Sequence, residues 1–335
     1  MLDVSEVLKK VRRIEIIAKR AVNDLFAGQY KSVFRGRGME FSEVREYSPG
    51  DDIRSIDWNV TARAGRPYIK RFVEERELSI LFLVDISASG LFGSHRSKWE
   101  TAVEAAAVLM FSALKNNDKV GLITFADKVI DFYRPRKGKA NVLHLIRQLL
   151  SAEPIAEKTD LTPVLEYVNR TQKRRAVVFL ISDFFVDELI SDTKAPPQDK
   201  VLDSFFSSSH LKRSMVLQMI GKIQERPKES PQSRLLSLCN RRHDVIAMTL
   251  TDERESVFPD VGIITLQDAE TGELVEVDTS SAAVRALMAK QFQVGRERIA
   301  AALRRSRIDQ LEIGTNAPFL GDLQRFFHSR EKRLH

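Results

Sequence analysis

Residues 77–90 read ELSILFLVDISASG, and this stretch decides the fold. It opens with a short, continuous run of β-forming apolar residues at 80–84. A run of this kind is typical of a strand buried in a parallel sheet. The run ends at Asp85, and two hydroxyls follow at alternate positions, Ser87 and Ser89. Because open α/β sheets place ligand sites at the carboxyl ends of their strands, the sequence predicts an oxygen-rich site here.

Strand-like and helix-like stretches alternate along the rest of the chain. Further strands are expected at residues 119–125, 129–133, 176–181, 243–250, 262–266 and 310–313. Helices are expected at residues 97–115, 141–150, 163–172, 281–305 and 318–332. Such alternation predicts an α/β fold with a doubly wound, mostly parallel sheet.

Composition divides the chain into two parts. Residues 1–77 hold an amphipathic helical pattern over 3–27, followed by a β-rich segment with many glycines and charges. That segment has too little contiguous apolar sequence for its own core, so we expect it to pack on the main domain. Residues 78–335 are expected to form the α/β domain, with an insertion at 191–232 bounded by Pro-rich polar sequence. Two interpretations of the insertion stay open, a surface subdomain and a partly disordered segment.

Composition also indicates the cellular compartment in which we expect the protein. The 335 residues are 43% hydrophobic and 30% charged, as in ordinary globular proteins. No apolar run approaches the roughly 18 residues that span a membrane, and the N-terminal stretch lacks a signal-peptide core. We expect a cytoplasmic protein without a transmembrane segment, and peripheral contact with the inner face of a membrane stays open. Cys239, the single cysteine, lies among leucines and is expected to be a buried structural thiol.

The chain carries a formal net charge of +7. A basic balance permits nucleic acid or an anionic membrane as a partner. The basic residues are mixed with acidic ones, however, so we interpret the basic clusters as solvent-exposed faces of helices. We expect no nucleic-acid partner and keep nucleic-acid binding as an alternative.

Oxygen ligands are expected from three loops near the carboxyl ends of the strands. The candidate metal ligands are Asp85, Ser87, Ser89, Thr159 and Asp183. Two carboxylates and three hydroxyls suit Mg²⁺ or Mn²⁺, which prefer oxygen. Thr162, followed by Pro163, is expected to cap a helix, which leaves Thr159 for the metal.

The order of these motifs resembles the metal-ion-dependent adhesion site (MIDAS) of von Willebrand factor A domains. In that family a D-x-S-x-S motif is followed by a threonine and then by an aspartate after the next buried strand. The resemblance implies that the two serines touch the metal together with Thr159 or Asp183, and that other contacts run through water. It also implies that a partner's carboxylate fills the open coordination position.

Two further stretches resemble the signature of the bacterial domain-of-unknown-function family fifty-eight. They are residues 34–63, FRGRGMEFSEVREYSPGDDIRSIDWNVTAR, and residues 67–77, PYIKRFVEERE. Residues 243–255 and 271–279 fit the same family. Its members join this signature to a von Willebrand A domain and are commonly encoded beside MoxR-type AAA+ ATPases. The resemblance implies binding to such an ATPase or its client through an acidic residue, in chaperone-like assembly or envelope and stress maintenance.

The signature residues have a structural interpretation. Arg45 and Asp51 are expected to join a charge network, and Tyr47 and Trp58 are expected to pack as aromatic side chains. A partner- or anion-binding surface is the alternative for this segment.

A non-enzymatic, metal-dependent interaction module is the function favoured by the sequence. A Mg²⁺-dependent hydrolase or phosphatase is the enzymatic alternative, because two-carboxylate Mg²⁺ sites also transfer phosphoryl groups. The sequence contains neither a G-x-x-x-x-G-K-[ST] loop nor a G-x-S-x-G motif.

Overall fold

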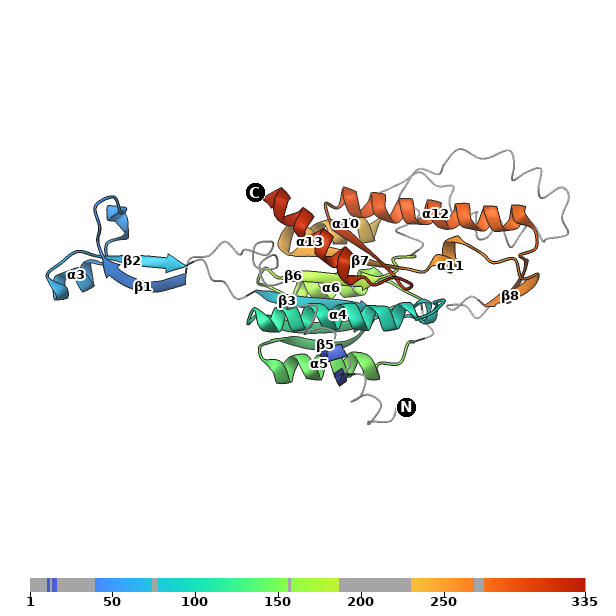
Figure 1. The fold of residues 1–335 in the computed structure, drawn as a ribbon, viewed down its shortest axis with the longest axis horizontal. Coiled ribbons are helices and arrows are strands. Elements are labelled where there is room, and N and C mark those ends of the chain that lie inside the picture. The colour runs from blue at the N-terminus through green and yellow to red at the C-terminus, as the bar shows by residue number, and fades with distance from the viewer. Residues whose placement is uncertain are drawn as a thin grey trace.

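The computed structural model describes an α/β domain and a separate β-hairpin module (Figure 1). The described residues are 11–12, 14–16, 40–73, 78–155, 158–186, 230–267 and 274–334. The strands of the central sheet are β3 (Ser79–Asp85), β4 (Lys119–Phe125), β5 (Val129–Arg136), β6 (Val177–Ser182), β7 (Asp244–Thr251) and β10 (Asp309–Gly314). The main helices are α4 (Lys98–Lys115), α5 (Lys139–Ser151), α6 (Leu161–Thr171), α10 (Pro231–Arg242), α12 (Ala282–Arg305) and α13 (Leu320–Leu334).

The central sheet has six strands in the order β10-β7-β6-β3-β4-β5. Every neighbouring pair is parallel except β4 with β5, which runs antiparallel at the edge. The predicted α/β fold with a mostly parallel sheet is therefore confirmed. Strand β3, which carries the D-x-S-x-S motif at its end, lies inside the sheet between β6 and β4.

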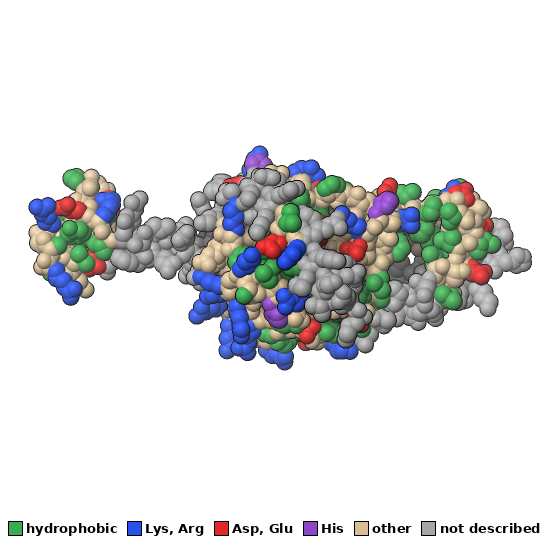
Figure 2. Space-filling model, turned by 60° about the horizontal axis from the view of Figure 1, so that its bottom comes forward, with side chains coloured by type: hydrophobic (Ala, Val, Ile, Leu, Met, Phe, Trp, Pro, Cys, Tyr) green, Lys and Arg blue, Asp and Glu red, His purple; other side chains and the backbone are tan. Residues whose placement is uncertain are grey.

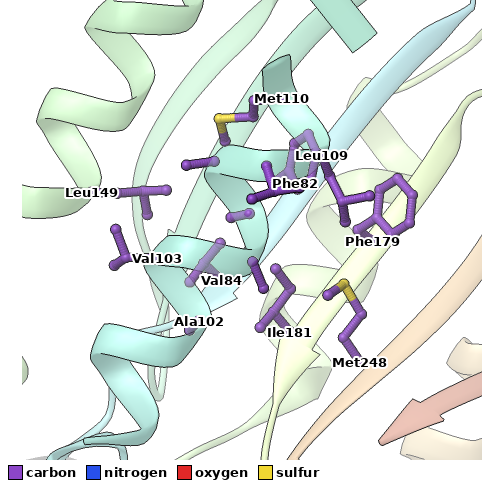
Figure 3. Packing of buried hydrophobic residues seen from close by; sticks show 14 of the residues in the cluster. Phe82, Val84, Ala102, Val103, Leu109, Met110, Leu149, Phe179, Ile181 and Met248 are labelled. Atoms are coloured by element: carbon purple, nitrogen blue, oxygen red, sulfur yellow. The ribbon is translucent and has the colours of Figure 1, made fainter. Parts of the chain in front are cut away.

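Side chains alternate along β3 and enter two cores. Ile80, Phe82 and Val84 lie in the core that α4, α5 and α13 cover, whereas Leu81 and Leu83 lie in the core that α6, α10 and α12 cover. This alternation places helices on both faces of the sheet. Figure 3 shows the first core, in which the ring of Phe82 stacks on that of its β6 neighbour Phe179 at 5.2 Å.

Helix α4 explains how the site loop is held against the sheet. Its buried positions include five alanines, and these small side chains let the helix approach the strands closely. Ser97 caps the helix, because its side chain accepts a hydrogen bond from the backbone N–H of Glu100 at 3.1 Å. The short helix η2 (Ala88–Leu91) precedes α4 and continues directly from the carboxyl end of β3.

Three details differ from the sequence-based expectations. The strand expected at 262–266 is β8 (Ile263–Gln267), which pairs with β9 (Leu274–Asp278) in a separate hairpin. Helix α10 was not predicted. Asp160 caps α6 in place of Thr162, because its carboxylate accepts the Thr162 N–H at 2.8 Å. Of the expected insertion at 191–232, residues 191–229 lie outside the described residues.

The N-terminal stretch contributes to the domain core. Val11 and Ile14 are helical and buried in the core that includes α5. Glu15 forms an ion pair of 2.9 Å with Lys139 of α5. Most of the helix expected at 3–27 lies outside the described residues.

Residues 40–73 form the hairpin module, and Figure 1 shows it apart from the α/β domain. Strands β1 (Glu40–Glu46) and β2 (Tyr68–Val73) pair antiparallel and flank helices η1 (Ile53–Ser55) and α3 (Trp58–Ala64). For the residues that the structure describes, Figure 1 shows no packing of this module on the α/β domain, contrary to the expectation from the sequence.

Local polar contacts stabilise the described part of the module, in which Ile69 is buried. Asp52 and Asp57 cap η1 and α3, and Arg45 pairs with Asp51 at 2.7 Å, as expected. Trp58, expected to pack, is 66% exposed, and Figure 2 shows hydrophobic and basic side chains on the surface of the module. No helix in the described part of the chain has an apolar stretch of the length that a bilayer requires.

Candidate metal centre

The five predicted ligands come from loops that the sheet brings together at its carboxyl edge. Strands β3 and β6 pair in parallel with Val84 beside Ile181, so Asp85 and Asp183 leave the sheet at neighbouring points. The loop before α6 is attached to the same edge, because the Ile155 N–H donates to the Ile86 carbonyl at 2.9 Å. This attachment brings Thr159 against the D-x-S-x-S loop.

Four of the five side chains form one continuous hydrogen-bond network. The Thr159 hydroxyl lies 2.8 Å from Ser87 Oγ and 3.2 Å from Asp85 Oδ2. The hydroxyls of Ser87 and Ser89 are 3.0 Å apart. The other carboxylate oxygen of Asp85, Oδ1, accepts the backbone N–H of Ser87 at 2.9 Å. Asp85, Ser87 and Thr159 are all buried.

The donor set fits a small divalent cation. Mg²⁺ binds oxygen at about 2.1 Å in octahedral geometry, so neighbouring ligand oxygens lie about 3.0 Å apart. The side-chain oxygens of this network are spaced at 2.8–3.2 Å. No cluster of three or more His, Cys, Asp or Glu side chains suited to a metal occurs among the described residues. A cation at this edge would therefore rely on the hydroxyls of Ser87, Ser89 and Thr159 as well as on carboxylates.

Asp183, the fifth predicted ligand, lies at the same hollow but has different partners. The lining of this hollow includes Asp85, Ser87, Ser89 and Asp183. The carboxylate of Asp183 accepts the Lys98 ammonium at 3.0 Å through Oδ2 and the Phe185 N–H at 3.3 Å through Oδ1.

Backbone conformation fixes the turn that carries Asp183. Phe184 has φ of 59° and is fully buried, although bulky side chains disfavour this left-handed region. The hydroxyl of Ser182 accepts the Phe184 N–H at 3.0 Å and donates to Asp85 Oδ2 at 2.6 Å. Ser182 thus links the turn after β6 to the carboxylate at the end of β3.

The two aspartates repel each other across the hollow. Burial is the largest cause that raises the pKa of Asp85 to about 6, and the charge of Asp183 is the second. The hydrogen bonds from Ser182 and Ser87 act in the opposite direction. Positive charge between the two carboxylates would relieve this repulsion.

Lys98 and Glu255 belong to the site although the sequence did not reveal them. Lys98 is the first residue of α4, and its side chain is 2% exposed. Its ammonium contacts both Asp183 and Glu255, which lies in the short helix α11 (Glu253–Ser256). One signal was present: a lysine at a helix N-terminus opposes the helix dipole, so its charge needs a partner.

A family model described as "Protein of unknown function DUF58" matches residues 43–201 and 201–298. An uncharacterized protein of Mycobacterium tuberculosis is 27% identical over 334 residues, covering 99% of this chain and 92% of the relative. The uncharacterized protein YeaD of Bacillus subtilis is 28% identical over 120 residues, covering 34% of this chain and 28% of the relative.

A solved structure, the conserved hypothetical protein BatB of Bacteroides thetaiotaomicron, aligns with 76% of this chain and 99% of its own. That alignment has a TM-score of 0.41 and 13% identity. Because the family model matches well over half of the sequence, the chain belongs to the DUF58 family of proteins of unknown function.

Proposed function

We propose that this chain is a metal-dependent protein-interaction module of the von Willebrand A type. The observation that carries the proposal is the network of oxygens from Asp85, Ser87, Ser89 and Thr159 at the carboxyl edge of the sheet. The strand order, with an antiparallel strand at one edge of a parallel sheet, supports the same assignment. When bound, Mg²⁺ or Mn²⁺ supplies an open coordination position for an outside oxygen.

The residues of the site would have different roles in metal binding. Asp85 would provide charge and orient the loop, since its Oδ1 accepts the Ser87 N–H and its Oδ2 accepts the Ser182 hydroxyl. Ser87, Ser89 and Thr159 would provide neutral oxygen ligands. Neutral ligands leave positive charge on a bound cation, and a carboxylate from a partner is the natural group to compensate it.

A MoxR-type AAA+ ATPase, or a client of one, is the partner class that we propose. The resemblance of residues 34–77 to the family signature motivates this choice, and the exposed hairpin module offers a second contact surface. Ile53 and Trp58 are 65% and 66% exposed there. The metal site would supply the acid-specific part of such an interaction.

Calorimetric titration with Mg²⁺ and Mn²⁺ tests the metal site. We expect one site, lost in Asp85→Ala and in the double variant Ser87→Ala/Ser89→Ala. Ser280→Ala is the control, because Ser280 is exposed and lies outside the network. Equal affinity in wild type and in the double variant, with both proteins folded, would reject the assignment.

Binding of a purified MoxR-type ATPase tests the partner. Capture should succeed with Mg²⁺ and fail for Ser87→Ala/Ser89→Ala at the same Mg²⁺ concentration. This comparison is sharper than chelation, because the ATPase itself uses Mg²⁺ with its nucleotide. Undiminished capture by the double variant would contradict a metal-mediated contact. Turnover of phosphate esters that Asp85→Ala abolishes would favour a hydrolase instead.

A further inference from the structure

A buried ammonium lies beside the candidate metal site, and the von Willebrand A resemblance does not account for it. Lys98 Nζ lies 3.0 Å from Asp183 Oδ2 and contacts Glu255 Oε1. The rings of Phe92 and Phe185 cover it, with their centroids at 5.9 and 6.0 Å. The ammonium is thus held between two carboxylates and shielded from water by two aromatic rings.

The two carboxylates stabilise the charge of this lysine. Burial alone would lower the pKa of Lys98, but Asp183 and Glu255 outweigh burial, and the pKa is raised above its usual value. A buried ammonium without a partner is strongly unfavourable, so at least one carboxylate must stay with Lys98. Because it has two partners, it can give up one of them.

We propose that the Lys98 ammonium competes with a divalent cation for Asp183, and that Glu255 retains the ammonium when Asp183 turns to the metal. This inference rests on the proposed metal site and explains what would limit the affinity of that site for the metal. Asp183 is the one predicted ligand that has a cationic partner among the contacts described. The other four ligands are bonded to one another and need no exchange.

Charge balance supports the competition. Asp85, Asp183 and Glu255 set three carboxylates against the one ammonium of Lys98, a formal charge of −2 when all are ionised. A divalent cation neutralises this cluster without expelling Lys98. Glu255 is well placed to hold the ammonium, because it also accepts the Asp252 N–H at 2.9 Å in a capping box.

Two single variants and their combination distinguish two explanations of metal affinity. In the first, Lys98 competes with the metal for Asp183; in the second, only the net charge of the cluster matters. Lys98→Met keeps most of the buried side-chain volume, frees Asp183, and should bind Mn²⁺ about tenfold more tightly or better. Glu255→Gln removes the second partner of the ammonium and should weaken Mn²⁺ binding by about tenfold. The double variant Lys98→Met/Glu255→Gln frees Asp183 while the formal charge stays at −2.

The double variant is decisive. Competition predicts that it binds Mn²⁺ alone several-fold more tightly than wild type in calorimetry, whereas total charge predicts equal affinity. The melting temperature in EDTA supplies a second readout, since Lys98→Met should melt lower than wild type and regain stability when Mn²⁺ is added. Should Lys98→Met not fold, the double variant, with one buried carboxylate fewer, still gives the comparison.

The outcomes distinguish this inference from the proposed function. Mn²⁺ binding to wild type with equal affinity in the double variant would overturn the competition and leave the metal site standing. No Mn²⁺ binding by wild type or by any folded variant would reject both.

Discussion

The carboxylate of Asp252 accepts two hydrogen bonds from Ser94, although 158 residues separate them in sequence. The Ser94 N–H lies 2.9 Å and the Ser94 hydroxyl 3.1 Å from Asp252 Oδ2. The hydroxyl of Thr315 donates to the same oxygen, and the Arg254 N–H donates to Oδ1 at 2.8 Å. Asp252 therefore joins the loop after η2, helix α11 and the loop after β10.

Replacement of Asp252 should loosen all three segments together. Asp252→Asn keeps the size of the side chain but presents an amide to several donors, so we expect the free energy of unfolding to fall by about 2–3 kcal/mol. Urea denaturation measures this loss. Asp260→Asn is the control, because Asp260 is 60% exposed and its pair with Arg285 should contribute less than about 1 kcal/mol. Equal losses in the two variants would contradict the role of Asp252.

The two parts of the N-terminal region should differ in their importance for stability. Ile14 is buried in the domain core, so Ile14→Asp places an unpaired charge there and should lower the free energy of unfolding by about 3 kcal/mol or more. Trp58→Asp should change it by less than about 0.5 kcal/mol, because Trp58 is 66% exposed. Chemical denaturation followed by circular dichroism compares the two.

The fluorescence of Trp58 provides an independent check. Acrylamide should quench an emission component that is absent in Trp58→Phe. A large loss of stability in Trp58→Asp, or protection of Trp58 from acrylamide, would show that the module packs on the domain after all.

The parts of the fold that follow from local sequence were predictable. Strand β4 was expected at 119–125, which are its observed bounds, because residues 120–125 are mostly apolar and β-forming, as in a buried strand. That two of the predicted ligands meet at one edge of the sheet was predictable for a similar reason. Asp85 ends β3 and Asp183 directly follows β6, so the parallel sheet brings them to one edge.

The parts that depend on contacts between distant residues were not predictable. The place of Lys98 at a helix N-terminus indicates only that its charge needs a partner; the partners, Asp183 and Glu255, lie 85 and 157 residues further along the chain. The location of the hairpin module depends on whether apolar residues gather on one side of it. Ile53 and Trp58 are exposed, and no periodic pattern in the sequence reveals this.

Glycine is required at position 121 because the backbone of the neighbouring edge strand, β5, lies close to it. Gly121 lies in β4 where the pairing with β5 shifts register, and a Cβ there would lie 2.8 Å from the Tyr133 carbonyl oxygen and the Pro135 nitrogen. Because the neighbours are backbone atoms, they cannot move aside cheaply. We expect Gly121→Ala to lower the free energy of unfolding by about 2–3 kcal/mol.

Gly314→Ala is the matched control for this prediction. Gly314 likewise lies in a strand of the central sheet, the edge strand β10, but a Cβ there would meet no atom within 4 Å. The control substitution should be neutral or stabilise the protein by up to about 1 kcal/mol, because alanine restricts the unfolded chain. Thermal and urea unfolding of both variants measure the contrast. Similar stabilities of the two variants would show that β5 moves to make room for a Cβ at position 121.

His243, a buried residue, follows α10 as its C-cap and directly precedes β7. It is 1% exposed, and neither ring nitrogen has a hydrogen-bond partner within the described structure. Burial first, and then the charges of Arg242 and Arg175, lower the pKa of His243 to about 4. The folded protein therefore holds this side chain neutral at pH values where the unfolded chain binds a proton.

This depressed pKa predicts a loss of stability in acid. Between pH 6.5 and 4 the unfolded state binds the extra proton, so the free energy of unfolding should fall as pH decreases, by up to about 1.4 kcal/mol per pH unit. His243→Leu removes this contribution and sacrifices no hydrogen bond of the ring, so its stability should depend less on pH in that window. Urea denaturation at half-unit pH steps measures the two slopes, and His95→Leu, at an exposed histidine, is the control. Parallel curves for wild type and His243→Leu would mean that the imidazole is charged or solvated in the folded protein.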